Sequence, residues 1–282
     1  MSWEFFPVKY LPLLLLLFQP ALLFSQQRPL VTERAETLKK NDLLFDIGME
    51  FLQDAVFAFS GLEGDLTRIG VLGVRFGAAD NVEIQVLGTI QDILSIENRF
   101  PAPNTPNLDF SGNSTSDFGD FTMATKVLLK KEQNRWPAIA MRFGFQMPNT
   151  SNAKGLGNDE TNFFSSFLLQ KQFGKLQVFT ELGLAVLGDP VSPGAQDDLF
   201  TYGFALMHPL NDQINLVVDA YGRVGAGGIG TEEQSLLRLG TQIKAAGLYW
   251  DVALFLGFRD TDPSSGLVVG VSKEFRLPFF GN

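Results

Sequence analysis

The chain has 282 residues, a formal net charge of −9 and no cysteine. The lack of cysteine excludes disulfides, iron–sulfur clusters and thiolate zinc sites. The negative charge argues against nucleic acid as a partner, because a phosphate-binding surface needs clustered lysine and arginine. Length alone permits one large domain or two smaller ones.

Residues 1–25 predict a secretory signal peptide. Lys9 precedes an apolar run over residues 11–24, which is the order of charges and apolar residues found in such peptides. The alternative is a transmembrane anchor. It is disfavoured because about 14 residues are short for a hydrocarbon core of ~30 Å, and because Pro12 and Pro20 interrupt the run.

Composition divides the rest of the chain into a polar lead, a barrel region and a short tail. Cleavage is expected between Ser25 and Gln26, and the polar residues 26–41 predict a flexible periplasmic lead. No later apolar run approaches ~18 residues, so no membrane helix is expected. A barrel is expected over residues 42–276, followed by a short C-terminal tail at 277–282.

Apolar and polar residues alternate with a period of two through most of the chain. In the hairpin over residues 69–90, Leu72, Val74 and Phe76 lie on one face of the first strand. A turn at 78–81 follows, and the second strand repeats the alternation. Strands of about ten residues with one apolar face are the repeating unit of a barrel whose outside meets lipid.

Twelve segments of this kind are predicted, although pattern alone also permits ten or fourteen. In the sixth segment both faces carry Phe and Ser, and we assign Phe163, Phe167 and Leu169 to the outside. The fold class expected is an all-β, antiparallel, up-and-down transmembrane β-barrel. The segments cover residues 45–51, 69–77, 82–90, 120–130, 138–147, 162–173, 177–186, 200–206, 214–223, 237–244, 249–258 and 267–275.

The predicted connections alternate between long and short. This alternation is typical of an antiparallel meander with one rim outside the cell and the other in the periplasm. Both ends of the barrel then lie at the periplasmic rim, where Trp136 and Trp250 are expected at headgroup level. The long connections are 53–65, 91–119, 148–161, 188–198, 225–234 and 259–266, and the short ones are 78–81, 131–137, 174–175, 210–213 and 245–247.

The chief alternative is a soluble β-sandwich or lipocalin-like protein, whose strands also alternate. In that fold the apolar rows would form a core. Here the apolar rows are nearly uniform along all twelve segments. If these rows faced water, the exposed apolar area would far exceed the few hundred Å² of contiguous apolar surface that soluble monomers show. Gly and Ala recur on the polar face, where a narrow lumen crowds side chains. We therefore favour a lipid-facing barrel.

The polar faces predict the lining of the lumen. Charges there must be hydrated or paired, and Arg75 and Glu83, placed symmetrically about the 78–81 turn, are expected to face each other. A mixed charged and aromatic lining suits a slender amphiphilic or aromatic solute, whereas the alternative is a closed plug of salt bridges. The connection 91–119 either folds inward as a constriction or projects outside. The predicted lumen-lining residues are Arg75, Glu83, Lys126, Arg142, Phe179, Glu181, Asp219, Tyr221, Arg223, Arg238, Tyr249 and Asp251.

No catalytic, cofactor-binding or metal-binding residues are predicted. The single histidine, His208, lies at a strand end before a proline, and Ser272 lies on the inner face, which does not match the outer-face pair of a barrel lipase. Residues 225–230 match G-x-G-x-x-G, but a strand-like pattern follows instead of the helix that a dinucleotide site needs. The protein is not expected to be an enzyme.

Several short motifs resemble the outer-membrane family named for the putative MetA pathway of phenol degradation. The resemblance covers roughly residues 43–275 and implies a Gram-negative outer-membrane barrel that acts as a channel for aromatic or other hydrophobic compounds, not a degradative enzyme. One departure is that RLPFFGN follows Phe275, whereas such barrels usually stop at the aromatic residue that closes the last strand. The motifs are RFG at 75–77, DNVE at 80–83, Gly119 and Asp120 leading to Lys126, and Pro148 opening the next loop.

These observations predict a passive outer-membrane channel or transporter for small solutes. The expected partners are outer-membrane lipid and lipopolysaccharide, the barrel-assembly machinery and an unidentified small solute. A structural or adhesive barrel without conductance is the first alternative, and a soluble secreted β-protein is the second.

Overall fold

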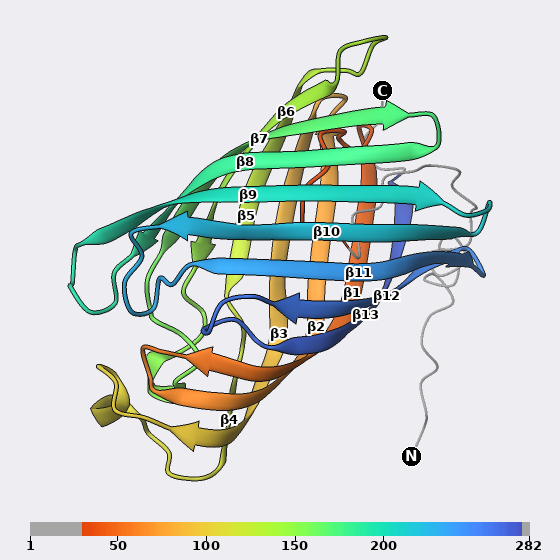
Figure 1. Ribbon diagram of the computed structural model, residues 1–282. Coiled ribbons are helices and arrows are strands. Elements are labelled where there is room, and N and C mark those ends of the chain that lie inside the picture. The colour runs from red at the N-terminus through yellow and green to blue at the C-terminus, as the bar shows by residue number, and fades with distance from the viewer. Residues whose placement is uncertain (1–29, 278–282) are drawn as a thin grey trace, which may run out of the picture.

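The computed structural model describes residues 30–277 and shows twelve antiparallel strands closed into a barrel (Figure 1). Sequence neighbours pair around the wall and the first strand pairs with the last, which confirms the predicted fold and strand number. The strands are β1 (Asp42–Phe57), β2 (Leu62–Ala79), β3 (Val82–Arg99), β5 (Phe121–Lys130), β6 (Ala138–Met147), β7 (Asn162–Phe173), β8 (Leu176–Gly188), β9 (Gln196–Pro209), β10 (Ile214–Gly225), β11 (Gln234–Ala245), β12 (Leu248–Gly257) and β13 (Ser265–Arg276).

Three short elements lie in the connections. β4 (Ser114–Asp117) pairs with the far half of β3, and η3 (Thr105–Asn107) and η4 (Asn152–Lys154) are single turns of 3-10 helix. Across residues 30–277, no helix has the length and apolar character that crossing a bilayer requires. The predicted signal peptide, and the predicted tail after Leu277, lie outside the described residues.

The two ends of the barrel differ in their connections. The end called here the long-loop end carries residues 58–61, 100–120, 148–161, 189–195, 226–233 and 258–264. The opposite, short-turn end carries residues 80–81, 131–137, 174–175, 210–213 and 246–247. Trp136 and Trp250 both lie near the short-turn end, because one sits in its longest connection and the other near the start of β12.

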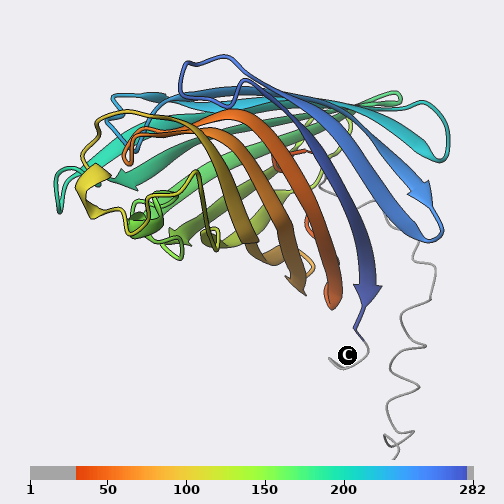
Figure 2. The same cartoon turned by 90° about the horizontal axis from the view of Figure 1, so that it is seen from below.

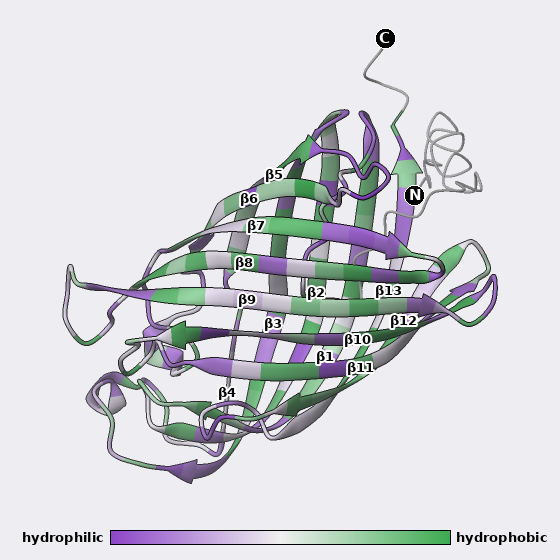
Figure 3. Ribbon diagram, turned by 45° about the horizontal axis from the view of Figure 1, so that its top comes forward, coloured by the Kyte–Doolittle hydropathy of each residue, from purple (hydrophilic) through white to green (hydrophobic). Residues whose placement is uncertain are grey.

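The outer surface of the wall is apolar. Phe163 and Phe167 are 55% and 56% exposed, and Leu169 is also exposed, as predicted for the sixth segment. Figure 3 shows hydrophobic and hydrophilic residues alternating along the strands. Such an exterior is unfavourable in water and is what a hydrocarbon solvent requires.

β1, β2 and β3 extend further than predicted at the long-loop end, and they curve along their length (Figure 2). In these extensions the polarity is inverted, since Leu66 and Leu94 are buried on the inside while Asp65 and Glu97 are exposed. The prediction ended the strands early because it followed apolar residues on the outside. The inverted part packs as a soluble protein does, around a cluster made of Leu52, Ala55, Leu62, Leu66, Leu94, Ile96, Leu236 and Phe255.

The connection that follows β3 packs against the connection 148–161. Asn104 is 1% exposed and donates a side-chain hydrogen bond to the Asn152 carbonyl at 2.6 Å. Asp120 accepts hydrogen bonds from the backbone N–H groups of Asn149 and Thr150, both at 2.9 Å. The predicted bounds of the connection 91–119 are wrong, because residues 91–99 belong to β3. Part of the rest folds inward, since Leu108 and Phe110 pack against the buried cluster, and part joins the neighbouring connection.

Residues 30–41, the lumen segment, lie inside the barrel. Leu30, Thr32, Ala35 and Leu38 are each at most 4% exposed. The sequence predicted a flexible lead over residues 26–41, and for the described part of that range the prediction is wrong. Its polar composition suggested contact with water, whereas these polar groups contact a polar lumen.

Candidate functional site in the barrel lumen

Wall side chains hold the lumen segment by accepting hydrogen bonds from its backbone. The Asp219 carboxylate on β10 is fully buried and accepts from the backbone N–H groups of Val31 at 2.5 Å and Thr32 at 3.0 Å, and from the Thr32 hydroxyl. Hydrogen bonds to a charged group contribute about 1.5–3 kcal/mol each. Asp219 therefore anchors the start of the described segment.

The same type of contact recurs along the segment, from three other strands. Because these are separate side-chain contacts, and residues 30–38 form no β-ladder with the wall, the segment is attached more weakly than a thirteenth barrel strand would be. Each contact joins a wall side chain to a backbone N–H: Glu181 to Glu33 at 3.0 Å, Gln170 to Glu36 at 3.4 Å, and Glu83 to Leu38 at 2.9 Å.

Glu33 provides the charged contact between the segment and the wall. Its carboxylate lies 3.2 Å from Nζ of Lys126 and 3.8 Å from a terminal nitrogen of Arg75. Lys126 also lies 3.1 Å from Glu83, and Arg75 pairs with Asp46. All five side chains are buried. Removing one partner from such a pair costs about 3–5 kcal/mol, since the other charge stays buried without compensation.

Two glycines leave room for the segment. Gly203 on β9 directly opposes Glu181, and a Cβ atom added to it would lie 2.4 Å from the Thr32 hydroxyl oxygen. A Cβ added to Gly77 on β2 would lie 1.9 Å from the carbonyl oxygen of Lys39. The close approach of the segment therefore depends on the absence of a side chain at both positions.

The predicted pairing of Arg75 with Glu83 across the hairpin is wrong. Arg75 opposes Gln85, and Glu83 opposes Gly77, because the chain turns at residues 80–81, whereas a pairing of Arg75 with Glu83 needs a hairpin centred on Ala79. Both charged side chains still face the lumen. They meet through the lumen segment, since Arg75 binds Glu33 and Glu83 binds the backbone of Leu38, and not through each other.

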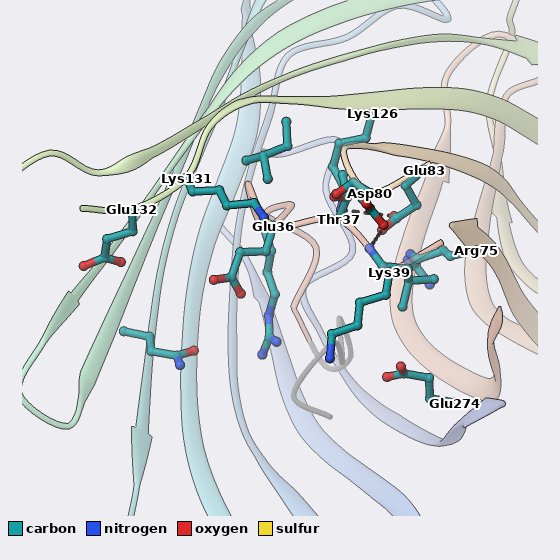
Figure 4. Close-up of a pocket in the computed structure, with 14 residues that line it drawn as sticks. Glu36, Thr37, Lys39, Arg75, Asp80, Glu83, Lys126, Lys131, Glu132 and Glu274 are labelled. Atoms are coloured by element: carbon teal, nitrogen blue, oxygen red, sulfur yellow. Dashed lines mark hydrogen bonds and ion pairs between the residues drawn. The ribbon is translucent and has the colours of Figure 1, made fainter. Parts of the chain in front are cut away.

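The lumen segment lies between two cavities. The long-loop chamber, of about 510 Å³, is bordered by Thr32 and Glu33 of the segment and by wall residues that include Arg142, Glu181 and Arg223. The short-turn chamber, of about 660 Å³, is bordered by the later part of the segment and by wall residues of the opposite end. Figure 4 shows Glu36, Lys39, Lys131, Glu132 and Glu274 around the short-turn chamber.

Other predicted lumen residues contact the segment or one another. Phe179 is fully buried, with the Arg34 guanidinium 5.3 Å from the centre of its ring. Arg238 donates to the Tyr221 hydroxyl at 3.2 Å and lies 2.8 Å from Glu50. These contacts fix the aromatic rings in the wall, so they are less free to bind a solute than the sequence suggested.

Two predicted residues lie away from this group. Tyr249 borders a smaller cavity of about 280 Å³ near the short-turn end, and the Lys244 ammonium lies 5.7 Å from its ring centre. Asp251 is 1% exposed on β12, opposite Gln242 and Gly270. All twelve predicted residues therefore lie on the inner side of the wall, but in separate clusters.

Sequence reasoning missed the contribution of the lumen segment itself. Glu33 and Arg34 fall in a stretch without strand alternation, so no periodicity indicated that they are buried. Leu30, Ala35 and Leu38, spaced through the polar stretch, were the only available signal that this part of the chain packs against something.

The connections at the long-loop end are strongly acidic. They contain ten carboxylates and two cations, whereas the connections at the short-turn end contain three of each. The electric field of these excess carboxylates attracts cations that approach the long-loop end and repels anions. The ten carboxylates are Asp109, Asp117, Asp120, Asp159, Glu160, Asp189, Glu232, Glu233, Asp260 and Asp262, and the two cations are Lys154 and Arg259.

The barrel has counterparts among solved structures. The chain is similar to the COG4313 outer membrane channel from Pseudomonas putida F1, with a TM-score of 0.64 and 15% sequence identity over 86% of this chain and 98% of that one. The fold is that of an outer-membrane β-barrel. The NanC porin is also similar, with a TM-score of 0.50 and 10% identity over 83% of this chain and 100% of that one.

At these identities the similarity establishes the fold. No protein-family model matches the chain, and no curated protein sequence matches it. The narrower resemblance to the MetA-named family therefore stays a prediction.

Proposed function

We propose that the protein is a passive outer-membrane channel for small solutes and that the lumen segment narrows it at rest. The observation that carries this proposal is the position of the segment, with a chamber on either side of it. Withdrawal of residues 30–38 would join the two chambers into one path. The structural similarity to an outer membrane channel and to a porin supports the same reading.

The class of solute that passes the channel is also part of the proposal. The MetA resemblance favours aromatic or hydrophobic compounds, whereas the long-loop chamber is bordered by charged groups that include Arg142, Glu181 and Arg223. We expect a transport role without catalysis. A liposome-swelling panel of phenolics, fatty acids, nucleosides and sugars separates the two classes of solute.

Single-channel recording in planar bilayers tests the channel itself. In the variant Gly203→Val the new side chain competes with Thr32 for space, so the segment is displaced while valine remains favourable in a strand. We expect a small conductance for the unmodified protein and a several-fold larger one for G203V. The matched control is Gly112→Val, because a Cβ added at Gly112 meets nothing within 4 Å.

The alternative of a structural or adhesive barrel predicts a different result. If folded protein, identified by heat-modifiable migration in gels, gave no current in either the unmodified or the G203V form, the channel proposal would be wrong. A larger current in G112V as well as G203V would show that the lumen segment does not control the path.

A further inference from the structure

Two arginines of the long-loop chamber, Arg142 and Arg223, have no carboxylate within ion-pair distance among residues 30–277. Nε of Arg142 donates to a glutamine side-chain oxygen at 2.8 Å, and Nε of Arg223 donates to the Glu232 carbonyl oxygen at 2.8 Å. Over residues 30–277 neither arginine forms an ion pair, and their terminal nitrogens make no hydrogen bond. The Arg142 guanidinium lies 4.6 Å from the centre of the Phe164 ring, a contact that leaves its terminal N–H groups available. A guanidinium fork of this kind has the geometry that binds a carboxylate with two parallel hydrogen bonds.

The strand register places the two arginines at the ends of one row across the wall. Arg142 on β6 opposes Ser166 on β7, Ser166 opposes Gly183 on β8, and Gly183 opposes Thr201 on β9. Thr201 in turn opposes Arg223 on β10. Of the three small residues between the arginines, Thr201 borders the chamber beside Arg223, and Ser166 and Gly183 lie in the wall of the barrel.

Glu181 supplies the opposite charge beside this row. It lies two residues before Gly183 on the same face of β8 and accepts hydrogen bonds from the Ser166 hydroxyl at 2.8 Å and from the backbone of Glu33. In the part of the chain that the structure describes it makes no ion pair. An ionised carboxylate can accept about four hydrogen bonds, so Glu181 retains capacity for an ammonium group.

The charges of the molecule restrict the class of solute further. The acidic long-loop end disfavours the entry of anions. Inside the chamber Glu33, Asp46 and Glu50 are paired with wall arginines, whereas Arg142 and Arg223 form no ion pair within residues 30–277 and disfavour a simple cation. A solute that carries both charges avoids both penalties. The chamber volume of about 510 Å³ lies within the range of ~300–1,000 Å³ typical of small-molecule sites.

We propose that the long-loop chamber is a binding site for small zwitterions of the amino-acid type, with the carboxylate at Arg142 or Arg223 and the ammonium at Glu181. The site deepens the proposed channel function and rests on it for its role in transport. Binding itself does not need withdrawal of the lumen segment, because Arg142, Glu181 and Arg223 border the chamber while the segment is in place.

Calorimetric titration of the folded, detergent-solubilised full chain tests the site. The probes are 4-aminobutyrate, butyrate and butylammonium, which share a carbon chain and differ in charge. We expect the zwitterion to bind about tenfold or more tightly than either singly charged probe, since it alone gains charge-assisted hydrogen bonds at both ends. The same ranking is expected for the block of potassium chloride current in bilayers.

Two variants give opposite changes in preference. The double substitution Arg142→Gln and Arg223→Gln should weaken butyrate and 4-aminobutyrate relative to butylammonium, and Glu181→Gln should weaken butylammonium and 4-aminobutyrate relative to butyrate. Asp212→Asn, in an exposed short turn, is the control and should leave the ranking unchanged. A loss of structure would lower all three affinities together, and heat-modifiable migration identifies it.

The outcomes separate the site from the channel. Equal affinities for the three probes, no binding at millimolar concentration, or variants without the crossed change would each overturn the site. Selective binding without any current would overturn the proposed channel and leave the site. Current without selective block by 4-aminobutyrate would support the channel and contradict the zwitterion site.

Discussion

At the scale of single residues, the lumen is organised by buried charges that belong to two different parts of the chain. Glu33 comes from the segment, while Lys126 and Arg75 come from strands on the wall. Each charge has a partner within reach, so the cost of burying it is offset locally. These charged pairs therefore add to the hydrogen bonds that hold the backbone of the segment in the lumen.

Lys126→Met should release the lumen segment. The substitution leaves Glu33 and Glu83 without their shared cation, at a cost of about 3–5 kcal/mol, which exceeds the ~0.5–1.5 kcal/mol of a single ordinary hydrogen bond. Trypsin is too large to enter the barrel, so cleavage after Arg34, which is 6% exposed, reports release. We expect cleavage at least about tenfold faster in K126M.

Lys131→Met is the control for that experiment. Lys131 borders the same chamber but, among the described residues, forms no ion pair. Equal resistance to trypsin in K126M and the unmodified protein would contradict the role given to Lys126.

At the scale of elements, the long-loop end is a second packing unit built on the first three strands. Their extensions carry apolar residues inward around Leu66 and Leu94, and the connections 100–120 and 148–161 fasten to each other above them. A strand in lipid needs apolar residues outside, and the same strand in water needs them inside. The point where the polarity inverts marks the boundary between the two solvents.

The double substitution Asp117→Ala and Asp120→Ala should loosen the connection 148–161. It removes the carboxylates that accept from the backbone N–H groups of Ser151, Asn149 and Thr150, with a loss of about 1.5–3 kcal/mol for each charge-assisted bond. Hydrogen exchange of those three amides should become faster while the barrel strands stay protected.

Asp109→Ala provides the comparison at the same end. Its ion pair with Lys154 joins side chains that are 47% and 41% exposed, and exposed pairs contribute only ~0–1 kcal/mol. Exchange at residues 149–151 that is unchanged by the double substitution, or changed equally by D109A, would show that these carboxylates do not fasten the loop.

At the scale of the whole molecule, the belt of outward residues defines where lipid lies. Leu182→Arg, in the middle of β8, should destabilise the folded barrel by about 2–4 kcal/mol, because a charge at the bilayer midplane loses its hydration. Phe173→Arg, at the end of β7 beside a short turn, should cost about 0–1 kcal/mol. Urea unfolding in lipid vesicles measures both. Equal costs at the two depths would argue against a bilayer centred on the belt.

The sequence by itself determined the barrel and its lining. Strand β6, for example, was readable in full because Phe143 and Phe145 alternate with Arg142 and Gly144, and this local period of two decides which side meets lipid. The alternation also identified all twelve lumen residues as inward-facing. Side chains of a strand alternate between its two faces, so once one residue is assigned to a face, the faces of all the others follow.

The tertiary structure alone decided what fills the lumen and which charges remain free. Whether Glu33 meets Lys126, and whether Arg142 lacks a carboxylate, depends on contacts between residues far apart in sequence, which no local pattern encodes. The inverted polarity at Leu94 has the same origin. Local periodicity reports the solvent on each side of a strand, whereas pairing inside a closed barrel depends on how its strands and the lumen segment are brought together.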